Sequence, residues 1–262
     1  MALFTAKPAD GVVWITGGST GIGAQSAIRF ANQGFTVFVS ARSEKDLDKL
    51  ARSYSGKGEI RYLPLDVTNR TACQKALDDI RGQGFEVAVA LFNAGMFEHM
   101  KGSELTLDGF EKTFAVNFSG VVNCLVPVVD QMKRIGKGQI AVVASVSGYG
   151  GLRLASAYGA SKAALINMCE SLKFDFDAMN IKIQVVNPGF IDTPMTEQNK
   201  FPMPFLMPLD KAADRLVASM KKDMFEITFP KRFTWLLKFI NILPYPLYFW
   251  LVGRGTSGGK KK

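Results

Sequence analysis

The chain has 262 residues, of which 47% are hydrophobic and 21% are charged, a composition that excludes collagen-like, coiled-coil and fully disordered proteins. Its formal net charge is +9, but residues 230–262 carry seven basic and no acidic side chains, so the rest of the chain is nearly neutral. A protein that binds nucleic acid needs a basic face on its folded body, and we therefore expect no nucleic-acid partner.

Cysteine and histidine are sparse in this chain. The three cysteines are widely spaced and form no CxxC pair, and the single histidine is His99. This pattern predicts neither a metal site nor a disulfide framework, and it favours the reducing cytoplasm. The N-terminal residues contain no long apolar stretch, so no signal peptide is expected. We expect His99 to be a surface or lid residue.

Apolar strand-like runs alternate with helix-like segments along the chain. Strands are predicted at residues 12–15, 36–39, 60–65, 87–92, 140–144, 181–187 and 225–229. Helices are predicted at 21–33, 44–53, 103–134 and 157–179, and in a segment that Thr68 caps and that ends near residue 82. Apolar strands that are each followed by a helix form a parallel sheet covered on both faces. The predicted fold is therefore α/β, a Rossmann-like doubly wound parallel sheet of six or seven strands.

A glycine-rich segment with the sequence TGGSTGIG occupies residues 16–23, between the first strand and the first helix. Its glycines permit a tight turn and close approach of a pyrophosphate, and the helix N-terminus supplies unpaired N–H groups. A plain glycine turn remains open as the alternative, because the spacing differs from the GxGxxG fingerprint. The residues expected to contact cofactor phosphates are Gly17, Ser19, Thr20, Gly21, Ile22 and Gly23.

The end of the second strand bears on the choice between NAD and NADP. NAD-binding sites of this kind carry an acidic residue here that binds the ribose 2′-hydroxyl. In this chain no acid precedes Glu44, and Arg42 stands in the corresponding region with Ser43 beside it. Arg42 can pair with a 2′-phosphate, so the sequence predicts NADP(H). The alternative is that Arg42 is a solvated surface arginine.

Tyr158 and Lys162 are four residues apart in a predicted helix. Residues at this spacing share one face of a helix. An ammonium group beside a phenol favours the phenolate, so we expect Lys162 to lower the pKa of Tyr158 and make it a general acid or base. A YxxxK pattern alone is also compatible with an ordinary exposed helix face.

Together these motifs resemble those of the classical short-chain dehydrogenase/reductase family, over residues 11 to about 195. Further residues match the family's pattern in order and spacing. They are Asp66 and Val67 after the third strand, Asn93, Ala94 and Gly95 after the fourth, Asn117 in a helix, Ser145 after the fifth, and Pro188, Gly189, Ile191 and Thr193 after the sixth. One departure is Ala144, where many members have a second serine.

The resemblance implies a role for each matching residue. Tyr158 would exchange a proton with the substrate oxygen, which Ser145 would bind. Lys162 would also hold the nicotinamide ribose, and Asn117 would support a water-linked proton relay. Asp66 would contact the adenine, and Ile191 and Thr193 would orient the carboxamide. The family's motif at Asn93, Ala94 and Gly95 would brace the sheet beside the cofactor. The family also implies a homodimer or homotetramer.

A substrate lid is expected at about residues 190–210. It is rich in apolar side chains, and flexible methionines suit an irregular apolar ligand. The sequence therefore predicts a hydrophobic, lipid-like substrate, with plain lid packing as the alternative. The apolar lid residues are Met195, Phe201, Met203, Phe205, Leu206 and Met207.

Residues 231–262 are predicted as a hydrophobic, basic extension that follows the domain at 1–230. Pro244 and Pro246 split its apolar stretch into pieces too short to span a bilayer. This pattern favours a peripheral membrane contact, with aromatic side chains near the interface. They are Trp235, Tyr245, Tyr248 and Trp250. The alternative is that the segment covers the active-site mouth or a subunit interface. Such tails are similar to those of 3-ketodihydrosphingosine reductase-like enzymes.

The predicted function is NADPH-dependent reduction of a carbonyl group on a hydrophobic, lipid-like substrate, with Tyr158 as general acid. Two alternatives remain open. One is an NAD(P)-dependent dehydrogenase that oxidises an apolar secondary alcohol of steroid or retinoid type. The other is a membrane-docked NADP(H)-binding regulatory protein. The expected location is the cytoplasm, peripheral at a membrane.

Overall fold

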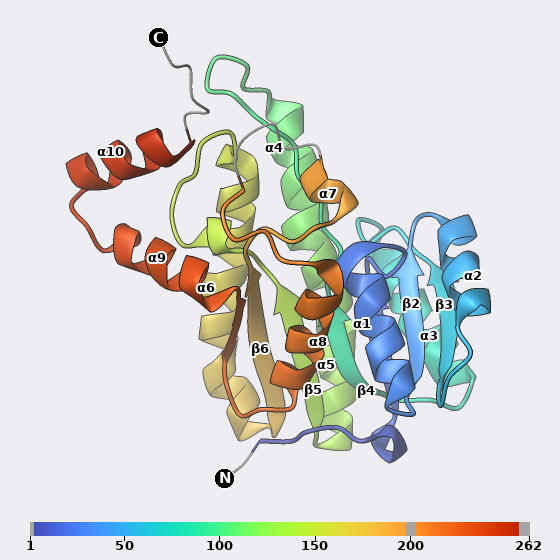
Figure 1. Cartoon of the computed structure of the whole chain (residues 1–262). Helices are drawn as coiled ribbons and strands as arrows, with labels where there is room; N and C mark the ends of the chain where they lie inside the picture. Colours follow the sequence, from blue (N-terminus) through green and yellow to red (C-terminus); the bar gives the residue numbers. More distant parts are fainter. Residues whose placement is uncertain (1–2, 198–202, 257–262) are drawn as a thin grey trace.

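The computed structural model describes residues 3–197 and 203–256 and contains one parallel sheet (Figure 1). Its seven strands lie in the order β3-β2-β1-β4-β5-β6-β7, which reverses direction between β1 and β4. This arrangement confirms the predicted doubly wound sheet, including its seventh strand. The strands are β1 (Val12–Thr16), β2 (Thr36–Ala41), β3 (Glu59–Pro64), β4 (Val87–Phe92), β5 (Gly138–Val143), β6 (Ile181–Pro188) and β7 (Glu226–Phe229).

Helices cover both faces of the sheet because alternate side chains of each strand enter two separate apolar clusters. In β1, Val12 and Trp14 belong to one cluster, and Val13 and Ile15 belong to the other. The first cluster contains α3 (Arg70–Gly82), α5 (Gly120–Ile135) and α6 (Ser156–Ala178). The second contains α1 (Gly21–Asn32), α2 (Glu44–Ser53) and α8 (Leu209–Met220).

The N-terminus of α3 differs from the prediction. Asn69, not Thr68, caps this helix, and its Oδ1 accepts a hydrogen bond from the Ala72 N–H at 3.0 Å. The backbone N–H and hydroxyl of Thr68 both donate to the Asp66 carboxylate instead, at 2.9 and 2.8 Å. The carboxylate directs the Thr68 hydroxyl back toward the end of β3, so the cap moves one residue along the chain.

The helical region predicted at 103–134 begins later, at Leu107, and is not uniform. It consists of α4 (Leu107–Phe114), a π-helical segment η2 (Ala115–Ser119) and α5. By length and composition the whole run is apolar enough to cross a membrane. Its α5 side chains Val121, Leu125 and Val128 lie in the core against the sheet, and a buried core helix passes the same test.

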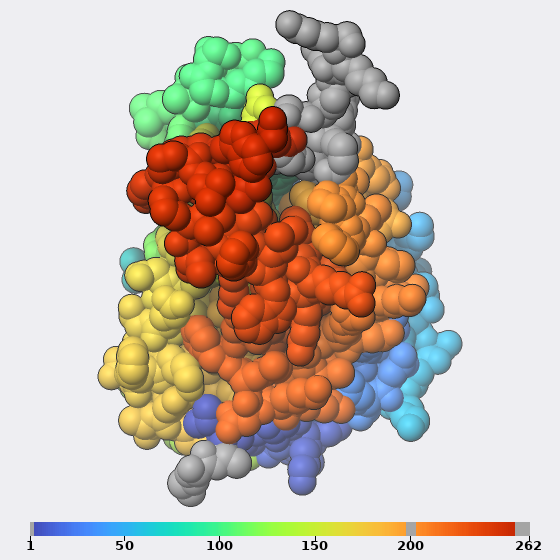
Figure 2. Space-filling model, turned by 60° about the vertical axis from the view of Figure 1, so that its left-hand side comes forward, coloured from blue at the N-terminus to red at the C-terminus, as the bar shows by residue number. Residues whose placement is uncertain are grey.

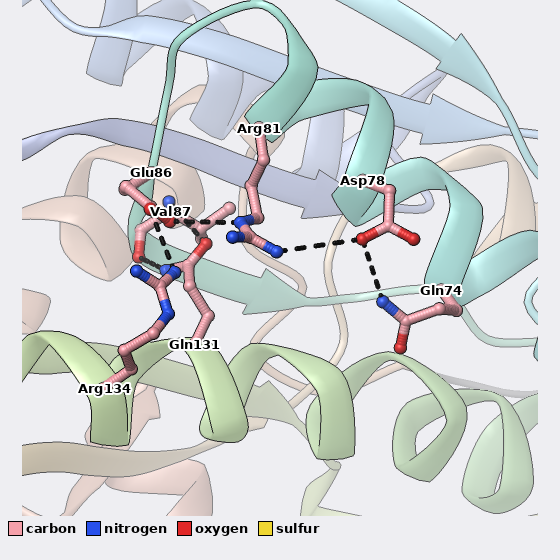
Figure 3. A network of polar contacts seen from close by, with 7 residues as sticks. All are labelled: Gln74, Asp78, Arg81, Glu86, Val87, Gln131 and Arg134. Atoms are coloured by element: carbon pink, nitrogen blue, oxygen red, sulfur yellow. Dashed lines mark hydrogen bonds and ion pairs between the residues drawn. The ribbon is translucent and has the colours of Figure 1, made fainter.

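Polar side chains anchor α3 and α5 at the amino end of β4 (Figure 3). Gln131 of α5 accepts a hydrogen bond from the Val87 N–H at 3.1 Å and donates to the Val87 carbonyl at 2.9 Å. Glu86 forms ion pairs with Arg134 of α5 at 2.9 Å and with Arg81 of α3 at 3.7 Å. This network stabilises the edge of the sheet opposite to the carboxyl ends of the strands.

Two helices follow β7, α9 (Lys231–Asn241) and α10 (Tyr245–Thr256), and they extend away from the sheet (Figure 1). Figure 2 shows their orange-red and red atoms on the surface of the molecule. Phe233 of α9 is buried and stacks on Phe190, with ring centroids 5.3 Å apart. Tyr248 of α10, which we expected near a membrane interface, is buried instead, because its hydroxyl donates a hydrogen bond to the Gly151 carbonyl at 2.7 Å. The two helices therefore pack on the loops at the carboxyl edge of the sheet, and their other faces remain exposed.

Candidate active site

The candidate residues lie at the carboxyl ends of the strands. The glycine-rich segment follows β1, and Arg42, Asp66 and Asn93 follow β2, β3 and β4. Ser145 follows β5, and Gly189 follows β6. In open α/β sheets a ligand binds at this edge, where the strand order reverses, so the topology brings together residues that are far apart in the sequence.

The glycine-rich loop forms a close backbone cradle. Gly17 has φ +66°, and a Cβ there would lie 2.7 Å from the Ala94 Cα. A Cβ on Gly23 would lie 2.3 Å from the Gly17 carbonyl oxygen. Asn93 Nδ2 donates to the Thr16 and Gly17 carbonyls at 3.3 and 2.9 Å, which braces the loop against β4. Side chains are excluded from this turn, so the backbone can approach a ligand closely.

The N-terminus of α1 adjoins this cradle. Thr20 is its N-cap residue, but its side chain forms no capping hydrogen bond. The first-turn N–H groups of α1 are therefore free to receive an anion, as a dinucleotide-binding loop requires. A Cβ on Gly21 would lie 3.6 Å from the Thr193 Cγ2, so the segment after β6 reaches the same loop. These residues fit a dinucleotide pyrophosphate.

Arg42 and Ser43 lie at the end of β2, and both are exposed. Ser43 Oγ accepts a hydrogen bond from the Asp46 N–H at 3.4 Å and caps α2, which leaves the hydroxyl proton available. The pKa of Asp66 is lowered by hydrogen bonds from the Thr68 backbone and side chain and, less strongly, by the charge of Arg42. Arg42 therefore lies close to the Asp66 carboxylate at one end of the site.

The four expected catalytic residues come together at the other end. Ser145 is buried, and its Oγ accepts a hydrogen bond from the Ser147 N–H at 3.1 Å. Lys162 is 3% exposed, and its Nζ donates to the Val143 carbonyl at 2.8 Å and lies 5.6 Å from the centre of the Tyr158 ring. Tyr158 and Lys162 thus share one face of α6, as their spacing predicts.

Asn117 is fully buried within η2 and uses its amide completely. Its Oδ1 accepts from the Met96 N–H at 2.8 Å, and its Nδ2 donates to the Met96 carbonyl and to Ser161 Oγ, each at 3.0 Å. A Cβ on Gly95 would lie 3.4 Å from both Asn117 Oδ1 and Lys162 Nζ. Gly95 therefore keeps open a position that lies between these two polar groups.

Burial controls the ionisation of the tyrosine and the lysine. It raises the pKa of Tyr158, and a hydrogen bond with Ser145 only partly opposes this effect. It also lowers the pKa of Lys162 to about 8. The lowering expected from Lys162 stays a prediction, and the net effect on Tyr158 is a raised pKa. The physical reason is that the loss of water around the buried phenol outweighs its neighbours.

Tyr158 and Ser145 open into a cavity of about 190 Å³ with mainly apolar walls. Its walls come from the loops after β4, β5 and β6 and from α7 (Pro194–Glu197). The lining residues are Phe97, Ser145, Val146, Ser147, Leu152, Arg153, Leu154, Ala155, Tyr158, Gly189, Phe190, Met195 and Thr196.

The apolar lid residues are distributed differently from the prediction. Met195 lines the cavity, but Phe205 and Leu206 are exposed outside it. Met207 is buried and pairs with Ile191, and its N–H donates to the Phe190 carbonyl at 2.9 Å. The prediction for Phe201 lies outside the described residues. Met207 therefore fastens the loop, and Met195 is the apolar lid residue that lines the cavity.

Sequence reasoning missed Phe97 and the segment Leu152–Ala155. Phe97 contacts the Tyr158 ring edge-on, with centroids 5.0 Å apart. Its neighbour His99 is exposed and contacts the Phe97 ring, as expected of a surface residue. The signal that could have found the missed segment is its position between Ser145 and Tyr158. No regular pattern marks it, because loops have no periodicity.

A second polar network, also missed, connects α9 to the active-site loops. Glu226 of β7 accepts hydrogen bonds from the Tyr149 hydroxyl at 2.6 Å and from Asn187 Nδ2 at 2.9 Å. It also forms an ion pair with Lys238 of α9. Tyr149 follows Ser145 in the chain, and Asn187 lies at the end of β6. One carboxylate therefore holds together the C-terminal extension and both sides of the cavity.

The part of the chain that the structure describes contains no group of three histidine, cysteine or acidic side chains that could hold a metal ion.

The profile of the short chain dehydrogenase family matches residues 11–202 of the chain. The chain belongs to this family. As a short-chain dehydrogenase it is an oxidoreductase that interconverts carbonyl and alcohol groups with a nicotinamide cofactor.

Relatives of this short-chain dehydrogenase span most of its length. An uncharacterized oxidoreductase from Myxococcus xanthus is 31% identical over 89% of this chain and 93% of its own. The 3-oxoacyl-(acyl-carrier-protein) reductase FabG of Thermotoga maritima is 32% identical over 71% of this chain and 76% of its own. An alcohol dehydrogenase from Thermococcus sibiricus, complexed with 5-hydroxy-NADP, has a TM-score of 0.75 at 23% identity, covering 83% of this chain and 95% of its own. This last similarity shows the fold.

Proposed function

We propose that this protein reduces a carbonyl group to an alcohol on a hydrophobic, lipid-like substrate, with NADPH as the reductant. The observation that carries the proposal is the apolar cavity onto which Tyr158 and Ser145 both open. An apolar wall favours a hydrocarbon chain, and the two hydroxyl groups supply the polar contacts for one oxygen atom. The relative named as a 3-oxoacyl reductase supports the reductive direction.

The side chains divide the work of proton transfer. When bound, the nicotinamide supplies the hydride. Ser145 binds the carbonyl oxygen, and Tyr158 donates a proton to it as the new alcohol forms. The raised pKa of Tyr158 keeps the phenol protonated near neutral pH, which suits a proton donor. Lys162, whose pKa is about 8, can replace the proton, and Asn117 is proposed to support a water-linked relay to it.

The opposite direction, oxidation of an apolar secondary alcohol, uses the same residues as a second candidate. It requires Tyr158 as a phenolate base, and burial disfavours that form near neutral pH. A purely regulatory NADP(H)-binding role is disfavoured for another reason. Asn117, Ser145, Tyr158 and Lys162 are all present, and Tyr158 faces an open cavity.

For the cofactor we propose NADP(H), held by Arg42 and Ser43 at the 2′-phosphate. Arg42 is exposed at the end of β2, where an acidic residue would bind a free ribose hydroxyl. A guanidinium group forms charge-assisted hydrogen bonds with a phosphate. The remaining proposed contacts are Gly17, Ser19, Thr20, Gly21, Ile22 and Gly23 for the pyrophosphate, Asp66 and Val67 for the adenine, and Asn93, Ala94, Gly95, Tyr158, Lys162, Pro188, Gly189, Ile191 and Thr193 for the nicotinamide side.

For the C-terminal extension we propose contact with an anionic lipid surface on the cytoplasmic side of a membrane. Its inner face packs on the protein through Phe233, but its outer face exposes large apolar side chains. Residues 230–262 are basic without any acid, which complements anionic headgroups. The exposed apolar residues are Trp235, Leu236, Phe239, Ile242, Tyr245, Leu247, Phe249 and Trp250.

We also propose a homodimer or homotetramer. Exposed apolar side chains on α5 and α6 support this proposal, because Val126 is 51% and Phe174 is 82% exposed. Burying such side chains against a second copy is favourable. Sedimentation of the purified protein would measure the assembly directly.

The test of the function is oxidation of NADPH by the purified full-length protein, with a long-chain 3-keto lipid and a short-chain ketone compared side by side. Tyr158→Phe serves as the control because it removes the proton donor but keeps the ring. We expect turnover of the long-chain compound that falls at least about a hundredfold in this variant. Turnover of the short ketone alone, or turnover that survives Tyr158→Phe, would overturn the proposal.

A further inference from the structure

The cavity that holds Tyr158 contains one feature that a neutral lipid ketone does not need. Its walls are mainly apolar, with hydroxyl groups at Ser145, Ser147, Tyr158 and Thr196. Among the described residues that line it, Arg153 is the one with a charged side chain. A positively charged residue at an otherwise apolar wall offers a ligand an ionic contact that the other lining residues do not offer.

The described part of the chain supplies no partner for the Arg153 side chain. The side chain is exposed, and within residues 3–197 and 203–256 it makes no hydrogen bond or ion pair. Several arginines of the chain are paired, such as Arg29 with Asp210 and Asp214, and Arg134 with Glu86. The Glu226 carboxylate, which binds Tyr149 of the same loop, also pairs with Lys238. The guanidinium is therefore available to a ligand at the mouth of the cavity.

The loop that carries Arg153 is held in place from both sides. Leu154 has φ +62°, a left-handed conformation that a branched residue adopts only where its surroundings impose it. The Leu154 carbonyl accepts a hydrogen bond from the Met100 N–H at 3.0 Å. On the other side the Tyr248 hydroxyl of α10 donates to the Gly151 carbonyl at 2.7 Å. The position of Arg153 is thus set by the loop after β4 and by the C-terminal extension.

We propose that Arg153 selects substrates with an anionic group, a carboxylate or a phosphate, on an otherwise apolar body. This inference rests on the proposed function, because the same molecule presents its carbonyl group to Ser145 and Tyr158. The apolar walls contact the hydrocarbon between the two ends. A planar guanidinium binds carboxylate and phosphate oxygens through two parallel hydrogen bonds. The anion stays at the solvent-exposed mouth, where its desolvation is incomplete.

Binding tests the inference without any turnover. The probes are octanoate, octyl phosphate and 1-octanol, which share a chain and differ in the head group, titrated calorimetrically into the full-length protein saturated with NADP⁺. We expect Arg153→Gln to lower the binding affinity for octanoate, for octyl phosphate or for both about tenfold. The affinity for 1-octanol should stay unchanged. Arg153→Lys should restore part of the loss. The matched control is Arg70→Gln, an exposed arginine at the start of α3.

The two anionic probes distinguish the two sources of charge. A loss confined to octanoate identifies a carboxylate, and a loss confined to octyl phosphate identifies a phosphate. Equal affinities of the three probes, or equal losses for all three in Arg153→Gln, would overturn the inference. A loss in Arg70→Gln of the same size would also overturn it, because the effect would then be one of net charge.

Activity separates this inference from the proposed function. NADPH oxidation is measured with 7-oxooctanoate and with 2-octanone, a charged and a neutral ketone of equal chain length. We expect Arg153→Gln to lower kcat/KM for the charged ketone about tenfold, mainly through KM, and to spare the neutral one. Tyr158-dependent turnover with no such change contradicts the role of Arg153. Anion binding without turnover of either ketone contradicts the proposed function and leaves Arg153 as an anion site.

Discussion

At the scale of single residues, Arg42 bears most directly on cofactor choice. It lies at the end of β2 with its side chain exposed and with the Asp66 carboxylate near enough to be influenced by its charge. A positive group there attracts a 2′-phosphate, and a negative group would repel it and accept a hydrogen bond from a ribose hydroxyl. The cofactor preference therefore depends on the sign of one charge.

The variant Arg42→Asp reverses that charge. We expect the ratio of kcat/KM for NADPH to kcat/KM for NADH to fall at least about tenfold, because a charge-assisted contact worth about 1.5–3 kcal/mol is lost. Steady-state kinetics with each cofactor measures the ratio. Lys45→Asp, on the exposed first turn of α2, controls for a general change of charge near the site. A ratio that stays the same in Arg42→Asp would refute the 2′-phosphate contact.

At the scale of secondary-structure elements, β7 and α9 are joined through one carboxylate. Burial alone would raise the pKa of Glu226, but hydrogen bonds from Lys238, Tyr149 and Asn187 outweigh burial and lower the pKa below its ordinary value of 4.5. A group whose pKa is lower in the folded state stabilises the fold above its ordinary pKa. This contribution is lost as the pH falls below about 4.5.

Glu226→Gln keeps an oxygen that can accept from Tyr149 but removes the charge that pairs with Lys238. We expect the free energy of unfolding at pH 7 to fall by about 1–2 kcal/mol, between the values for exposed and fully buried ion pairs. Urea denaturation at pH 7 and pH 4 measures it. The difference in unfolding free energy between the unaltered protein and Glu226→Gln should be smaller at pH 4 than at pH 7. A difference that is equal at both pH values would contradict the role of the ionised carboxylate.

The same experiment has a functional readout. Tyr149 and Asn187 border the loops that carry Ser145 and Gly189, and both bind Glu226. Glu226→Gln should therefore raise KM for the apolar ketone more than it lowers kcat. Lys238→Arg serves as the matched control, because an arginine retains the ion pair. Loss of stability without any change in KM would restrict this network to holding α9 on the sheet.

At the scale of the whole molecule, the C-terminal extension decides how the protein meets its surroundings. One face of α9 and α10 packs beside the cavity, and the other presents Trp235, which is 71% exposed, and Trp250, which is 50% exposed. A protein surface rarely exposes so many large apolar side chains together unless something covers them. The proposed lipid surface would place the cavity near the source of an apolar substrate.

Flotation with phosphatidylserine vesicles tests this contact. We expect the double variant Trp235→Ser and Trp250→Ser to lose at least about tenfold in partitioning, because interfacial binding scales with buried apolar area. The matched control replaces both residues by phenylalanine. Point substitutions are preferable to deleting residues 231–262, since the deletion would uncover Phe190 and the end of β7. Equal partitioning of the serine variant would refute the lipid contact, and equal binding to uncharged phosphatidylcholine would refute its electrostatic part.

The order of strands and helices, the glycine-rich turn and the shared helix face of Tyr158 and Lys162 were all predictable from the sequence. Each depends on neighbours within a few residues, through hydrophobic periodicity, glycine conformation and the 3.6-residue helical repeat. The location of the site at the carboxyl edge also followed, because a doubly wound parallel sheet brings all its strand ends to one edge. Local rules therefore determined the fold and the family.

Tertiary structure alone decided the environment of the site. Burial raises the pKa of Tyr158 and lowers that of Lys162, and the segments that bury them are distant in the chain. Arg153 lines the cavity on a loop that the Tyr248 hydroxyl binds from far along the chain. Glu226 of β7 holds α9 through its ion pair with Lys238. Burial and unpaired charge are properties of the packed surroundings of a group. No pattern within a single segment specifies them.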